Sequence, residues 1–247
     1  MSQQQNPPYG RRLILDIIKE RAHNEPDREW MSVPRSSDPK DGWKIVTYLD
    51  AYNGINRIAH KLTRVCGAPA PNSFPTVAYI GPNDVRYHVF ALGAVKAGFQ
   101  ALFISARNSA EGQLYLFEQT NCNILVFDQS YKAMVQPWLH EREMTAILAL
   151  PADEWFPANQ EDFPYNKTFE EAEWDPLLLL HTSGSTGFPK PIVARQGMLA
   201  IADKYHNLPP REDGKLMWVA EMSKRAKRIM HPSEYSPVKW SICRVQC

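Results

Sequence analysis

One segment of this sequence combines the residue types that bind phosphate, and it follows the apolar run Leu177–Leu180. From position 181 to position 190 it reads His-Thr-Ser-Gly-Ser-Thr-Gly-Phe-Pro-Lys. Bare backbone N–H groups, hydroxyl donors and one cation together suit the oxygens of a polyphosphate. The glycines permit close approach of the main chain to such a ligand. The predicted phosphate-binding residues are Thr182, Ser183, Gly184, Ser185, Thr186, Gly187 and Lys190.

The spacing within this segment argues against a Walker A loop. Gly184 and Gly187 lie three positions apart, and Phe188 and Pro189 stand between the second glycine and Lys190. In a Walker A loop the glycines are five apart and the lysine directly follows the second one. The alternative is a surface turn, which the lysine and the apolar lead-in disfavour.

The remaining histidines and the cysteines offer weaker chemistry. His60, His88 and His140 fall on predicted helices without partner carboxylates, so we expect structural roles for them. His181 occupies a strand end, where packing is favoured over catalysis. The four cysteines form no CxxC pair and no metal spacing with histidine, so the sequence predicts reduced thiols and no metal site.

Composition bounds the class of protein. Of 247 residues, 44% are apolar, enough for the core of one large domain or two small ones. With 28 basic and 27 acidic side chains, the chain lacks the charge of a nucleic-acid binder. No apolar run is long enough to span a membrane, and the first residues do not resemble a secretory signal. We therefore expect a cytoplasmic protein without nucleic-acid or membrane partners.

The elements that position the segment follow from periodicity. A helix near residues 13–24, a hairpin from residues 29–33 and 43–48, and a helix over 48–66 come first. Strands and helices then alternate to residue 150. This rhythm predicts an α/β fold with a mainly parallel sheet covered by helices on both faces. The acidic stretch 151–175 is expected to be an exposed connection.

The phosphate-binding segment and two upstream stretches resemble the motifs of a known family. Thr182–Lys190 resembles the signature phosphate loop of the adenylate-forming (AMP-binding) superfamily. Two upstream stretches, Val46–Leu62 and Ala94–Gly98, resemble its first two core motifs, in the expected order. His181 and Pro191-Ile192 resemble the adenylation domains of fungal nonribosomal-peptide-synthetase-like reductases.

The resemblance implies activation of a carboxylic acid with ATP and Mg²⁺ to an acyl-adenylate, which is then passed to a thiol. In that family the loop folds over the β and γ phosphates, so its hydroxyls, glycine amides and lysine would hold the leaving pyrophosphate. The resemblance leaves the acceptor open among a phosphopantetheine thiol on a downstream carrier domain, coenzyme A and a reductase domain. A carrier or reductase domain is the expected partner in a full-length relative. An aryl, keto or amino acid substrate is equally compatible with the sequence.

The resemblance covers only part of such an enzyme. We expect a flexible N-terminus over residues 1–10, a partial adenylation domain over 11–230 and a non-family basic tail over 231–247. Later family motifs, including the adenine platform, the ribose-binding aspartate and the C-terminal lysine, have no counterpart here. Two functions therefore stay open: the N-terminal, truncated part of an adenylating enzyme, inactive alone, or a non-catalytic remnant that binds nucleotide phosphates or pairs with another chain.

Overall fold

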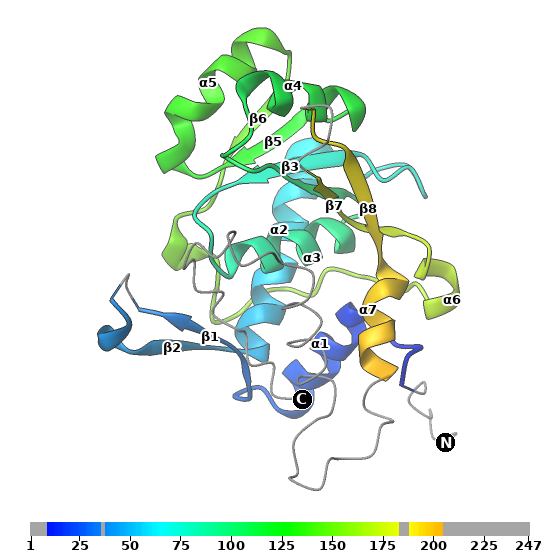
Figure 1. Ribbon diagram of the computed structural model, residues 1–247. Coiled ribbons are helices and arrows are strands. Elements are labelled where there is room, and N and C mark those ends of the chain that lie inside the picture. Colours follow the sequence, from blue (N-terminus) through cyan, green and yellow to red (C-terminus); the bar gives the residue numbers. More distant parts are fainter. Residues whose placement is uncertain (1–8, 36–37, 183–187, 205–247) are drawn as a thin grey trace, which may run out of the picture.

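The computed structural model describes residues 9–35, 38–182 and 188–204 (Figure 1). The predicted N-terminus and basic tail therefore lie mostly or wholly outside the described residues. The elements are α1 (Ile14–Asn24), β1 (Glu29–Pro34), β2 (Trp43–Thr47), α2 (Tyr48–Cys66), β3 (Thr76–Ile80), α3 (Arg86–Lys96), β4 (Gln100–Phe103), α4 (Ala110–Gln119), β5 (Ile124–Phe127), α5 (Lys132–Glu141), β6 (Thr145–Leu148), α6 (Phe169–Ala172), β7 (Pro176–His181), β8 (Pro191–Arg195) and α7 (Gln196–Asp203).

A six-stranded sheet forms the centre of the molecule. Its strand order is β6-β5-β3-β4-β7-β8, and β1 and β2 form a separate antiparallel hairpin. The first five strands of the large sheet are parallel, whereas β8 runs antiparallel to β7. Since parallel strands need crossovers, the intervening helices pack on the sheet. The predicted mainly parallel α/β fold is confirmed.

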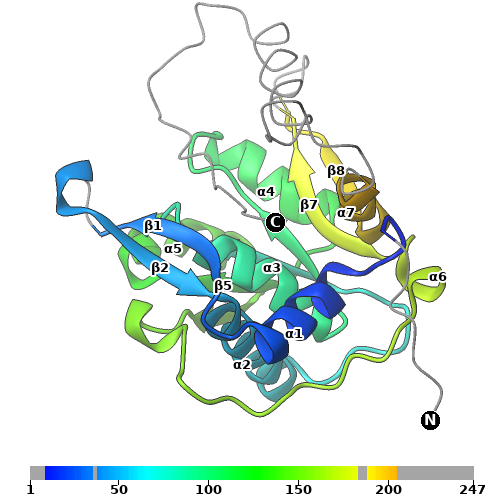
Figure 2. The same cartoon turned by 90° about the horizontal axis from the view of Figure 1, so that it is seen from below.

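Two hydrophobic cores lie on opposite faces of this sheet. Because alternate side chains of a strand point to opposite faces, Val77 and Tyr79 enter one core, while Ala78 and Ile80 enter the other. The first core also receives apolar side chains from α1, α2 and α3, and the second receives them from α4 and α5. Figure 2 shows α1 and α2 on one side of the sheet. Helices therefore cover both faces.

Helix α2 shows how local sequence sets its ends. Thr47 and Asp50 form a reciprocal capping box: the Thr47 hydroxyl accepts the Asp50 N–H at 3.1 Å, and the Asp50 carboxylate accepts the Thr47 N–H at 3.0 Å. The helix ends before Gly67, whose φ of +79° favours glycine. The expected helix over residues 48–66 is confirmed.

Most of the segment 151–175 is exposed or half-buried, as expected for a connection, but a few of its residues are anchored in the core. Trp155 is fully buried, and its indole N–H donates to the Leu150 carbonyl at 2.9 Å. The buried Asn53 amide of α2 donates to the carbonyls of Pro157 and Ala158. This segment runs alongside α2 (Figure 2). The acidic composition of the segment predicted exposure throughout and gave no sign of the few residues that pack on the first core.

At the other end of the sheet, β8 and α7 carry exposed apolar side chains. Ile192 and Val193 are 51% and 41% exposed, and Met198, Leu199 and Ile201 on α7 are exposed as well. Across the described ranges, no helix combines the length and apolar character needed to cross a membrane.

Candidate functional site

The predicted phosphate-binding segment is the connection between β7 and β8. His181 pairs with Pro191 across the two strands, and the Thr182 N–H donates to the Lys190 carbonyl at 3.0 Å. Thr182 and Lys190 are therefore neighbours at the base of a hairpin, and both are exposed. Residues 183–187, which hold the other five predicted phosphate ligands, lie outside the described residues. The base of the hairpin stands at the carboxyl end of a parallel strand, where ligands of open α/β sheets bind.

The arm of the connection that leads to Lys190 rests on α4. The Phe188 ring lies against that of Tyr115, with centroids 5.0 Å apart. Pro189 is buried against Gly112, where an added Cβ would stand 3.3 Å from the proline Cδ. The main chain before Lys190 is thus held by packing, while the lysine side chain is open to solvent.

The other arm is held by His181. Its Nε2 accepts a hydrogen bond from the Ser105 N–H at 3.2 Å, and the side-chain amide nitrogen of Asn108 lies 3.4 Å from the same atom. Ser105 and Asn108 follow β4, the strand that pairs with β7. An Nε2 that accepts requires the ring proton on Nδ1 when the imidazole is neutral. The His181 side chain therefore connects the loop base to the segment after the neighbouring strand. The sequence predicted a packing role for His181 and did not predict this hydrogen bond.

Buried polar groups extend this connection into the second core. The Gln113 side chain donates to the Ser105 carbonyl at 3.2 Å, and the indole of Trp138 donates to the Gln113 side-chain oxygen at 3.1 Å. Gln113 and Trp138 are both buried, on α4 and α5. Because buried polar groups that keep their partners are fixed in orientation, this series holds Ser105 against His181.

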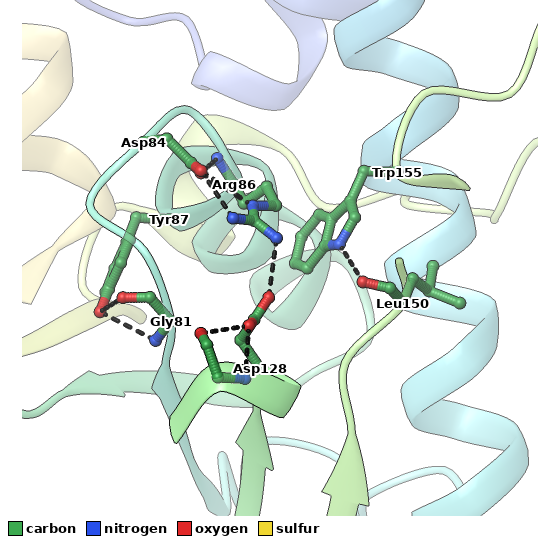
Figure 3. A network of polar contacts seen from close by, with 8 residues as sticks. Gly81, Asp84, Arg86, Tyr87, Asp128, Leu150 and Trp155 are labelled. Atoms are coloured by element: carbon green, nitrogen blue, oxygen red, sulfur yellow. Dashed lines mark hydrogen bonds and ion pairs between the residues drawn. The ribbon is translucent and has the colours of Figure 1, made fainter. Parts of the chain in front are cut away.

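A second polar cluster lies at the carboxyl ends of β3 and β5 (Figure 3). The buried Arg86 guanidinium donates to the Asp84 carboxylate at 2.7–3.0 Å and to Asp128 at 2.9 Å. Burial alone would raise the pKa of Asp128, but hydrogen bonds from Ser130 and the charge of Arg86 outweigh it and hold that pKa below its usual value. Since two carboxylates already occupy Arg86, this cluster fastens strand ends and is not an open phosphate site.

The described residues set limits on metal binding. In residues 9–35, 38–182 and 188–204, no group of three or more histidine, cysteine or acidic side chains could hold a metal ion. Thr182 and Lys190 offer a hydroxyl and a cation, which suit phosphate oxygens rather than a metal. The donors at the loop base are therefore compatible with phosphate oxygens, and phosphate binding there stays a prediction.

Comparison with known proteins decides the family. The family model described as "AMP-binding enzyme" matches residues 18–231. The chain belongs to this family. The resemblance predicted from the loop and the two upstream motifs is thereby confirmed.

Two curated relatives refine this AMP-binding assignment. The chain is 88% identical over 232 residues to a carboxylic acid reductase of Neurospora crassa. This match covers 94% of the chain and 22% of the reductase. It is 39% identical over 212 residues to an isocyanide synthase-NRPS hybrid of Aspergillus fumigatus, and this match covers 85% of the chain and 14% of the hybrid. The similarity to fungal NRPS-like reductases is confirmed. The chain spans 14% to 22% of the length of these relatives.

A solved AMP-binding structure shares the fold. The fatty acyl-adenylate ligase from L. pneumophila, solved in complex with acyl adenylate and pyrophosphate, matches with a TM-score of 0.59 at 16% identity. The match covers 79% of this chain and 32% of that one. The described sheet and helices are thus the arrangement found in part of an adenylate-forming enzyme.

Sequence reasoning missed the residues that support the loop and the cluster on Arg86. Ser105 and Asn108 follow the predicted strand near residues 101–104, and Asp84 and Asp128 follow two other strands. Polar residues just beyond parallel strands meet at one edge of the sheet, and this position was the available signal. The Asp84 carboxylate also accepts the Arg86 N–H at 3.0 Å, where α3 begins.

Proposed function

We propose that this chain supplies the pyrophosphate-binding loop of an enzyme that adenylates a carboxylic acid. The observation that carries the proposal is the pairing of Thr182 with Lys190 at the carboxyl end of β7. The arm before Lys190 is packed on α4, and the arm before Thr182 is bonded to Ser105 through His181. A loop base held in this way needs little reorganisation of its main chain when charge develops on a ligand.

The chemistry assigned to the loop is electrostatic. A carboxylate oxygen of the substrate attacks the α-phosphorus of Mg-ATP, the bond to the bridging oxygen breaks, and pyrophosphate leaves with that electron pair. In the proposal, Thr182, Ser183, Ser185 and Thr186 donate to the departing phosphates, together with the amides of Gly184 and Gly187. Lys190 offsets their charge. Phosphoryl chemistry depends mainly on such positioning and charge stabilisation. Mg²⁺ enters with ATP as part of the substrate.

The acid and its acceptor are proposed from the relatives. The name of the Neurospora crassa relative, carboxylic acid reductase, supports a carboxylic acid substrate. We assign transfer of the acyl group to a phosphopantetheine thiol on a carrier domain, with a reductase domain acting next, in the longer protein. The free thiols of Cys66 and Cys122 support a cytoplasmic location, where cysteines stay reduced.

Calorimetric titration of the 247-residue chain with Mg-ATP and with pyrophosphate tests the loop. Lys190→Ala should weaken binding about tenfold to a hundredfold, the range expected for one charge-assisted hydrogen bond. Lys44→Ala removes the same charge from an exposed position on β2 and should leave binding unchanged. Equal affinities for wild type and Lys190→Ala would exclude the loop as the phosphate site.

A further inference from the structure

A groove on the outer face of α2 lies away from the loop. Its volume is about 470 Å³, within the usual range of small-molecule sites. Four of its lining residues can carry positive charge, and all four come from the second half of α2. The lining consists of Arg57, His60, Lys61, Arg64, Val65, Leu150 and Gln160.

The cations of this groove are only partly neutralised. Arg57 pairs with Glu154 at 2.8 Å, and the Lys61 ammonium donates to the Leu148 carbonyl at 2.7 Å. Arg64 is exposed, and no carboxylate of the described residues pairs with it. Burial lowers the pKa of Lys61; the charge of Glu154 opposes this effect, and the charges of Arg57 and Arg64 add to it. Three cations therefore share one carboxylate.

This concentration of positive charge is local. Residues 1–214 contain 21 basic and 25 acidic side chains, so the body of the protein is net acidic. Arg57, Lys61 and Arg64 are spaced by four and three positions and share one helix face. A basic residue in the last helical turn also interacts favourably with the helix dipole, which accounts for Arg64 but not for Arg57, two turns earlier.

We propose that this groove binds a small organic phosphate, separately from the loop at β7. Arg64 and Lys61 would contact the phosphate oxygens, for which a guanidinium fork and an ammonium are suited. Val65 and Leu150 give the groove an apolar side for the remainder of the ligand. An anion at this place relieves the repulsion among the three cations, and this relief favours binding.

The groove is distant from the proposed ATP site. Leu150 lies just beyond β6, whereas Thr182 follows β7, and three strands separate β6 from β7 in the sheet. At a strand spacing of about 4.8 Å, four steps place the two strands roughly 19 Å apart. One small ligand cannot bridge that distance, so the two sites should bind independently.

Titration of pyrophosphate into the intact chain tests the proposal. Arg64→Gln should weaken one binding event about tenfold or more and leave the loop event unchanged, while Lys190→Ala should have the converse effect. Arg35→Gln, at an exposed arginine after β1, is the matched control. Thermal melting of each variant checks that the fold is intact. If the wild-type chain binds pyrophosphate only at the groove and not at the loop, the proposed function is refuted and the groove proposal stands.

Two outcomes would overturn the groove proposal. The first is equal pyrophosphate binding by Arg64→Gln and Arg35→Gln, which would show that the groove binds no phosphate. The second comes from titration with a hexaglutamate peptide. If this peptide binds more tightly than pyrophosphate and Arg64→Gln weakens its binding, the groove is a docking surface for an acidic protein segment.

Discussion

Lys96 and Asp162 form an ion pair whose two members differ in burial. The Lys96 side chain is 4% exposed, and its ammonium donates to Asp162 at 2.9 Å and to Asn56 at 2.5 Å. The Asp162 side chain is 41% exposed and also pairs with Lys19 at 2.8 Å. This difference predicts that removing one partner costs more than removing the other.

Asp162→Asn leaves a buried ammonium without a carboxylate, which should lower the free energy of unfolding by about 3–5 kcal/mol. Lys96→Met keeps the apolar stem and leaves a carboxylate that water and Lys19 still solvate. The loss is then that of charged hydrogen bonds, about 1.5–3 kcal/mol. Lys19→Met removes only an exposed pair and should cost at most about 1 kcal/mol. Urea unfolding at pH 7 measures all three.

The pH dependence of stability gives an independent check. Burial raises the pKa of Asp162, but hydrogen bonds from Lys19 and Lys96 outweigh it and hold the pKa well below its usual range. The unfolded chain therefore binds the proton first as pH falls. The contribution of Asp162 is full above about pH 5 and is lost progressively as the pH falls further. In Lys96→Met this acid loss should be smaller. An equal or larger cost for Lys96→Met than for Asp162→Asn at pH 7 would refute the reasoning.

Two further substitutions test the packing of α3 and the support of the loop. In Gly93→Ala the new Cβ would lie 2.6 Å from the Ile58 Cβ. The free energy of unfolding should therefore fall by about 1–3 kcal/mol, despite the better helix propensity of alanine. An unchanged urea midpoint would contradict this. His181→Phe leaves the Ser105 N–H without its acceptor and should lower both the melting temperature and the Mg-ATP affinity. His181→Asn keeps an acceptor, so both quantities should fall less. Equal behaviour of the two variants would show that the hydrogen bond is unimportant.

Local periodicity was enough to predict the alternating part of the fold. The apolar run Val77–Ile80 is buried on both faces, as expected for an inner parallel strand, and the strand and helix that follow it lie where the pattern put them. The family loop was also recognisable, because its residue types and spacing are local. These features need no information from distant parts of the chain.

The missed features depend on long-range contacts. Trp155 is buried in a stretch whose composition is that of a solvated loop, and its site is built by residues far away in sequence. His181 finds its partner 76 positions earlier, at Ser105. Strand β8 has no inward-facing apolar alternation, since its middle residues are exposed, so its pairing with β7 left no periodic signal.

The exposure of β8 sets a condition on any polypeptide that extends this sheet. Among the described strands, β8 is an edge, and its neighbours Ile192 and Val193 point to opposite faces. A strand that paired only through its backbone would leave both side chains in water. Covering one face alone would forgo about 1 kcal/mol of apolar burial on the other. A folded unit that covers both faces would therefore stabilise an extension at this edge by about 1 kcal/mol more than a unit that covers one face.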